Sequence, residues 1–119
     1  MLIKETSGVT SKINFIDEND NFVGFDSSQS CCEHLYYRFV DNESEIVEDD
    51  ELISSLRFTG KSKEEGHLND VDDEEDAAVS FEVTDGVNSY WLELHNSHNG
   101  YYSHYWESNI CGETSCGHI

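Results

Sequence analysis

The sequence predicts an α+β fold, in which a twisted antiparallel sheet carries one or two short helices on one face. Two observations predict the sheet: apolar and polar residues alternate over 13–25, and they alternate again over 78–106. A third predicts a helix, since the segment 30–33 has the Ser-x-x-Glu spacing of a capping box. The 119 residues fit a single domain, 1–119, and six Phe, six Tyr and two Trp residues indicate an aromatic core.

The first element is a β-hairpin within KINFIDENDNFVGFD. Ile13 and Phe15 alternate with polar residues before the turn 17–21, and Phe22 and Phe25 follow it. The turn is acidic, but it lacks the full ligand spacing and the distal Glu of a calcium loop. We therefore interpret it as a solvated turn between two strands.

The second element is a short helix that begins at Ser30. Leu35, Tyr36 and Phe39 would form its buried face at helical spacing. The same stretch, LYYRFV, is rich in residues that favour strands, so the sequence leaves the length of this helix open.

Two acidic segments occupy the middle of the chain. Residues 41–51 hold seven acidic side chains, and Leu52, Ile53 and Leu56 follow at helical spacing, which predicts a loop, a short helical turn and then a strand. Residues 64–76 hold eight more acidic side chains and no Lys or Arg. Because a block of like charges is typical of a solvated segment, we expect 41–51 and 64–76 to be acidic loops.

The last third of the chain predicts an antiparallel meander. A strand over 78–83 and a strand over 90–95 are joined by an Asp-Gly turn. An Asn-Gly turn at 99–100 then leads into a third strand, which ends at Trp106. The remaining residues, 110–119, fit either a final strand or a frayed tail.

The net charge of the chain limits the kinds of partner that it can bind. The chain has 26 acidic and six basic residues, a formal net charge of −20, which excludes ordinary nucleic-acid binding because phosphate contacts need clustered Lys and Arg. The charge favours a basic protein surface as partner, although solubility alone would also explain it. The expected interaction residues lie in the two acidic segments: Glu48, Asp49, Asp50, Glu51, Asp70, Asp72, Asp73, Glu74, Glu75 and Asp76.

The sequence also predicts a compartment. No apolar run is long enough to span a bilayer, and the N-terminal stretch MLIKETSGVT has no apolar signal core. We therefore expect a cytoplasmic protein with no membrane partner. In the cytoplasm, the four cysteines are expected to be thiols or metal ligands rather than disulfides.

Cysteine and histidine side chains could together hold zinc, which needs about four N or S ligands. Cys31 and Cys32 would supply two of them. With a two-residue turn at 99–100, His95 falls opposite His104, and this pair would supply the others. Because no known zinc-motif spacing is present, we expect no resident cofactor and keep zinc as the alternative.

The sequence supports a catalytic role less than it supports a binding role. Cys31 and Cys32 at the start of a helix would be stabilised as thiolates by the helix dipole. The chain has no C-x-x-C, G-x-S-x-G or H-E-x-x-H spacing and no Gly-rich phosphate loop. We therefore expect a non-enzymatic protein without catalytic residues, and a thiol-dependent enzyme is the further alternative.

Two stretches, QSCCEHLYY at 29–37 and LHNSHNGYYSHYW at 94–106, resemble a family of small uncharacterised proteins of phages and bacteria. Between them, EDDELISSLRF is similar to an acidic, leucine-containing segment of that family. The resemblance covers 26–106 and implies a phage or mobile-element setting and a small folded module, with no activity attached. It depends on two motifs, Q-x-C-C-E and N-G-Y-Y-S, formed by Gln29, Cys31, Cys32, Glu33, Asn99, Gly100, Tyr101, Tyr102 and Ser103.

These features together predict a small acidic binding protein, phage or mobile-element encoded, that engages a basic protein surface as a nucleic-acid mimic would. Two alternatives from other classes stay open. One is a zinc-stabilised Cys/His module, whose melting temperature a chelator would lower. The other is the thiol-dependent enzyme.

Overall fold

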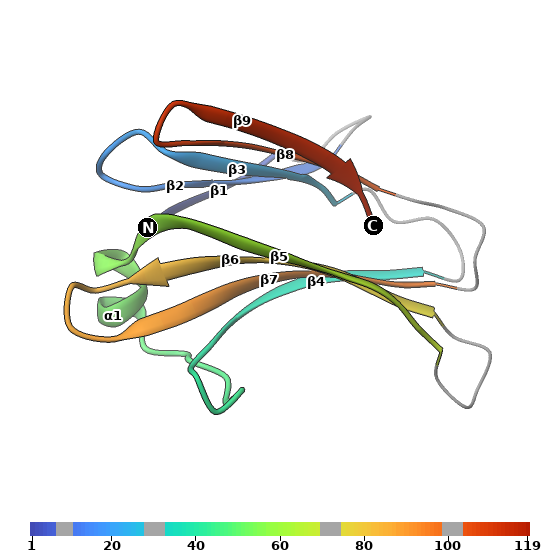
Figure 1. Ribbon diagram of the computed structural model, residues 1–119, viewed down its shortest axis with the longest axis horizontal. Coiled ribbons are helices and arrows are strands. Elements are labelled where there is room, and N and C mark those ends of the chain that lie inside the picture. Colours follow the sequence, from blue (N-terminus) through green and yellow to red (C-terminus); the bar gives the residue numbers. More distant parts are fainter. Residues whose placement is uncertain (7–10, 28–32, 70–74, 99–103) are drawn as a thin grey trace.

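The computed structural model describes residues 1–6, 11–27, 33–69, 75–98 and 104–119, which form a sandwich of two antiparallel sheets (Figure 1). The first sheet has the order β1-β2-β3-β8-β9, with β1 Leu2–Thr6, β2 Lys12–Ile16, β3 Phe22–Asp26, β8 Tyr105–Ile110 and β9 Glu113–His118. The second has the order β4-β7-β6-β5, with β4 Glu33–Val40, β7 Ser89–His98, β6 Glu75–Thr84 and β5 Arg57–Asn69.

The α+β prediction is wrong, because the described chain is nearly all β. Its one helix is α1, Asp50–Ser55, which has only six residues. This helix does confirm the short helical turn expected after 41–51, and β5 follows it directly. The N-cap is Asp49, whose carboxylate accepts hydrogen bonds from the backbone N–H groups of Glu51 and Leu52.

The helix predicted from Ser30 is the main source of that error. Residues 28–32 lie outside the described residues, and the stretch that follows is the strand β4. Leu35, Tyr37 and Phe39 all pack against the core, a period of two that only a strand produces. Strand-forming side chains that can bury every second position outweigh the capping signal, because tertiary burial stabilises more than a helix cap does.

The hairpin predicted over 13–25 is confirmed as β2 and β3. Asp17, buried in its turn, accepts hydrogen bonds at Oδ1 from the backbone N–H groups of Asn19 (2.9 Å) and Asn21 (3.0 Å). Its Oδ2 accepts one from the backbone N–H of Phe58 in β5, at 2.9 Å. A single carboxylate therefore organises the turn and joins the two sheets.

The predicted meander is correct for β6 and β7 and incorrect for the strand after them. Both edges of β7 are already hydrogen-bonded, to β4 on one side and β6 on the other. The chain therefore crosses to the first sheet, where β8 pairs with β3 and β9. The residues opposite His95 are Tyr36 and Ala78, so His95 and His104 do not form the expected cross-strand pair.

The second acidic segment, 64–76, is not a loop throughout. The strand β5 continues to Asn69 and β6 begins at Glu75, with 70–74 outside the described residues. An edge strand tolerates charged residues because one of its borders faces solvent. At the C-terminus, the described structure has the final strand β9.

The core lies between the sheets and is largely aromatic. Edge-to-face ring pairs connect the two layers: Phe81 of β6 with Trp106 of β8, at a centroid distance of 5.5 Å, and Phe15 of β2 with Tyr37 of β4, at 5.0 Å. No helix formed by the described residues is long and apolar enough to cross a bilayer.

Candidate functional site

The first acidic segment, 41–51, has an ordered backbone. Asp41 Oδ1 accepts hydrogen bonds from the N–H groups of Glu43 (2.8 Å) and Glu45 (3.0 Å), and the N–H of Val47 donates to the carbonyl of Phe39 (2.8 Å). Asn42, Ser44 and Ile46 are exposed on this frame, together with six carboxylates: Glu43, Glu45, Glu48, Asp49, Asp50 and Glu51. Such a frame fixes the spacing of the carboxylates, unlike a mobile loop.

Two acidic turns lie at the same end of the sandwich, between β2 and β3 and between β6 and β7 (Figure 1). Arg57 connects them, since its guanidinium lies 4.0 Å from Glu18 Oε1 and acts electrostatically on Asp85. Hydrogen bonds from the N–H groups of Asn88 and Val87 lower the pKa of Asp85, so it stays ionised. The helix α1 lies at the same end (Figure 1), and we call the six exposed carboxylates of 43–51, which lead into it and form its first turn, the acidic end.

The described parts of the second acidic segment, 64–69 in β5 and 75–76 in β6, lie at the opposite end of the sandwich (Figure 1). The molecule is 40 Å long, so the two segments do not form one surface. Of the residues expected to interact there, Glu75 and Asp76 lie in β6, opposite His98 and Ser97. The other expected residues of this segment, Asp70, Asp72, Asp73 and Glu74, lie outside the described residues.

Most of the motif residues also lie outside the described part of the chain: Gln29, Cys31, Cys32, Asn99, Gly100, Tyr101, Tyr102 and Ser103. Glu33 opens β4 and is the Cα partner of His98, the last residue of β7. The two motif segments are therefore attached to neighbouring strand ends.

The two histidines expected as zinc ligands have different partners. The ring of His95 stacks on Tyr36 at 4.7 Å, and its Nε2 lies 3.0 Å from Glu93 Oε1. His104 lies beside the first sheet, directly before β8, and its Nδ1 is 3.4 Å from Asp26 Oδ2 of β3. Within the described ranges no three Cys, His, Asp or Glu side chains converge as metal ligands. With Cys31 and Cys32 undescribed, zinc stays a prediction.

A charged network on the outer face of the second sheet was not expected from the sequence. Arg38 Nε lies 2.5 Å from Glu93 Oε1, directly across the β4–β7 pair, and Glu93 also contacts His95. Burial raises the pKa of Glu93, but hydrogen bonds from His95 and Arg38 and the charge of Arg38 outweigh it, so the pKa is lowered. Nearby, Lys63 Nζ lies 4.5 Å above the ring of Trp91.

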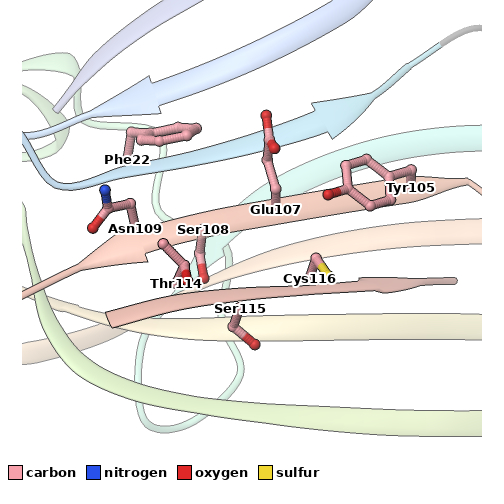
Figure 2. Close-up of a pocket in the computed structure, with 8 residues that line it drawn as sticks. All are labelled: Phe22, Tyr105, Glu107, Ser108, Asn109, Thr114, Ser115 and Cys116. Carbon is pink, nitrogen blue, oxygen red and sulfur yellow. The ribbon is translucent and has the colours of Figure 1, made fainter. Parts of the chain in front are cut away.

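A hollow of about 320 Å³ lies on the outer face of the first sheet (Figure 2). Tyr105 and Glu107 come from β8 and Cys116 from β9, while Phe22 borders the other side. Desolvation, a hydrogen bond with Cys116 and the charge of Glu107 raise the pKa of the Tyr105 hydroxyl. Sequence patterns could not reveal this hollow, because it depends on β8 joining β3.

Glu107 borders the hollow and also contacts the next strands. Lys12 Nζ lies 2.8 Å from Glu107 Oε1, and the lysine side chain passes over Gly24 of β3. A Cβ atom at residue 24 would lie 2.9 Å from Lys12 Cε, so the glycine gives the lysine its route across the strand.

A second hollow, of about 250 Å³, opens between the sheets beside β9. Gly60 and Ser62 of β5 line one side, Phe81 lies in β6, and Thr114 and Ser115 of β9 line the other side. Thr114 and Ser115 line both hollows, so β9 has a hollow on each of its faces.

The chain was also compared with known proteins. No protein-family model, no curated protein and no solved structure matches it. The resemblance to the phage and bacterial family therefore stays a prediction that depends on the sequence motifs.

Proposed function

We propose that the protein is a non-enzymatic binding protein whose acidic end docks on the basic surface of a partner protein. The observation that carries this proposal is the ordered backbone that presents exposed carboxylates over 43–51. Carboxylates on an ordered backbone lose less backbone freedom on binding than those of a mobile tract would.

Electrostatics supports this kind of partner. A protein with a formal charge of −20 attracts basic surfaces from a distance and speeds their encounter. The same field repels nucleic acid, so a groove that binds phosphates is a surface for which the acidic end would compete. This is the proposed sense in which the protein acts as a nucleic-acid mimic, in the phage or mobile-element setting that the motifs imply.

The proposal is restricted to one end of the sandwich. Because the segments 41–51 and 64–76 lie at opposite ends of a molecule 40 Å long, one groove would not engage both in the same way. The segment 41–51 is preferred, since its carboxylates are exposed on a defined backbone.

We also propose a cytoplasmic location. Cys111 and Cys116 carry free thiols that are exposed to solvent. Exposed free thiols suit a reducing compartment, whereas secreted proteins of this size more often have paired cysteines.

The test compares two variants with equal charge loss. The first, Glu45→Gln with Glu48→Gln and Glu51→Gln, removes three carboxylates of the acidic end. The control, Glu5→Gln with Glu64→Gln and Glu65→Gln, removes three elsewhere. Immobilised wild-type protein should retain basic proteins from a cell lysate at low salt and release them at about 0.5 M salt, where screening is strong.

For a purified basic partner, we expect the acidic-end variant to weaken binding about tenfold, at up to about 1 kcal/mol per exposed charge pair. The control should weaken it clearly less. If both variants weakened binding equally, binding would depend on the net charge of the molecule and not on the carboxylates of the acidic end. Retention that is insensitive to salt, or restricted to acidic proteins, would contradict the proposal itself.

A further inference from the structure

The borders of the two sheets differ in how they are protected against pairing with another chain. The border of β4 is covered at its C-terminal end by the following segment, since Val40 bridges Ile46 and Val47 N–H donates to Phe39. The strand β5 has two register shifts, and it carries Lys61 and Lys63. Bulges and lysines are common ways of blocking an edge strand.

The remaining borders belong to the first sheet. The strand β1 has five residues and carries the charged pair Lys4 and Glu5. In contrast, β9 has the sequence ETSCGH, without Lys, Arg or Pro, and pairs with β8 in continuous register from Glu113 to His118. Among the described residues no strand pairs with its outer border, which lies at the rim of the sandwich (Figure 1). Its backbone is therefore regular and available for pairing.

The two hollows beside β9 match the alternation of an added strand. Side chains of a strand point alternately to the two faces of its sheet. On one face they would meet the hollow of Figure 2, with Tyr105 and Glu107. On the other they would meet the hollow between the sheets, where Phe81 and Ile110 are apolar.

We propose that β9 accepts an extended, basic segment of a partner polypeptide as an additional strand of the first sheet. Backbone hydrogen bonds to β9 supply affinity, and alternate side chains supply specificity. Lys or Arg residues of the segment lie over the outer hollow, near Glu107 and the ring of Tyr105, and small apolar residues enter the hollow between the sheets.

Charge selects this occupant over a second copy of the same chain. Each copy carries a formal charge of −20, so pairing of two β9 strands would bring like charges together, whereas a basic segment is attracted. The site is separate from the acidic end, and it shares with the proposed function only the premise of a basic partner.

The test uses the whole protein and a synthetic peptide, acetyl-KVKVKVK-amide. Two further peptides carry N-methyl groups either on every Lys or on every Val. In a strand, residues of one alternating set direct their N–H groups to one border. Strand addition therefore predicts that one methylated peptide binds like the parent and that the other loses about tenfold or more in affinity. Equal affinities of all three peptides would overturn strand addition.

Two measurements locate the peptide. Amide hydrogen exchange should slow in 113–118 when the peptide is added. The variant Glu107→Gln should weaken binding up to about fivefold, while Glu5→Gln, which removes one charge at the opposite border of the same sheet, should have a much smaller effect.

Two outcomes separate this inference from the proposed function. Protection confined to 43–51, with equal binding of the methylated peptides, would overturn strand addition and favour docking at the acidic end. A stable dimer of the free protein in light scattering, with 113–118 protected, would assign the border of β9 to a second copy instead. Strand addition with an unaffected acidic end would support this inference even if the lysate experiment failed.

Discussion

Replacing Asp17 with alanine removes a side chain that links the two sheets through a hydrogen bond. Four donors would lose their acceptor: the backbone N–H groups of Asn19, Asn21 and Phe58, and the side-chain amide of Asn21. The donors of the turn can rehydrate, at about 0.5 kcal/mol each. The Phe58 N–H is in a buried contact, and leaving it unsatisfied costs about 1–3 kcal/mol. We therefore expect Asp17→Ala to lower the free energy of unfolding by about 3 kcal/mol.

Urea and thermal denaturation at neutral pH measure this loss. At about 4 °C per kcal/mol for a chain of this size, the melting temperature should fall by about 12 °C. Glu18→Ala is the matched control, because its side chain is 73% exposed and its ion pair is long; we expect a change within about 0.5 kcal/mol. Amide exchange at Phe58 should accelerate in Asp17→Ala alone.

A loss below about 1 kcal/mol for Asp17→Ala, with unchanged exchange at Phe58, would refute the reasoning. The buried carboxylate would then be a local feature of the turn. The two sheets would then be held together by the packing of their inner faces and by other links, such as the buried hydrogen bond from Asn96 Nδ2 to the carbonyl of Ile119.

The remaining predictions concern close packing and titration. Gly117→Ala should destabilise the protein by about 1–3 kcal/mol in denaturation, because a Cβ there would lie 2.9–3.0 Å from the Trp106 ring between the sheets. Gly24→Ala, where the nearest atoms are mobile side-chain ends, should cost clearly less, and equal losses would contradict this distinction. Because the pKa of Glu93 is lowered in the folded state, its contribution to stability is present above the unfolded pKa of about 4.3 and is lost as pH falls through the folded pKa. The difference in unfolding free energy between wild type and Glu93→Gln should therefore shrink below about pH 4. A difference that stays constant from pH 7 to 3 would be evidence against a stabilising ionised Glu93.

Local patterns predict the hairpins well, because alternation and turn residues lie within one short stretch. The turn at 17–21 and the Asp-Gly turn at 85–86 each connect the strands expected around them. The helix at Ser30 fails because a capping signal is weaker than burial of Leu35, Tyr37 and Phe39 at every second position.

Pairing between distant strands could not be predicted in the same way. Whether the strand ending at Trp106 returns to β7 depends on whether β7 has a free border, and β4 already occupies it. That contact joins residues more than fifty positions apart, such as Arg38 and Glu93. The hollow of Figure 2 depends on the β3–β8 pair. Neither the β4–β7 pairing nor this hollow can therefore be predicted from one short stretch of sequence.

The negative charge is largely separable from the forces that hold the fold together. Lys12 and Arg38 each bind a glutamate on an outer face, and Lys63 lies over Trp91. The carboxylates of 43–51 lie outside these contacts, on a helix and loop whose backbone is held by Asp41 and Asp49. Stability comes from the buried rings between the sheets, since exposed charges contribute little and like charges repel. Acidic-end variants should therefore fold normally, so a loss of partner binding in them would report on recognition rather than on unfolding.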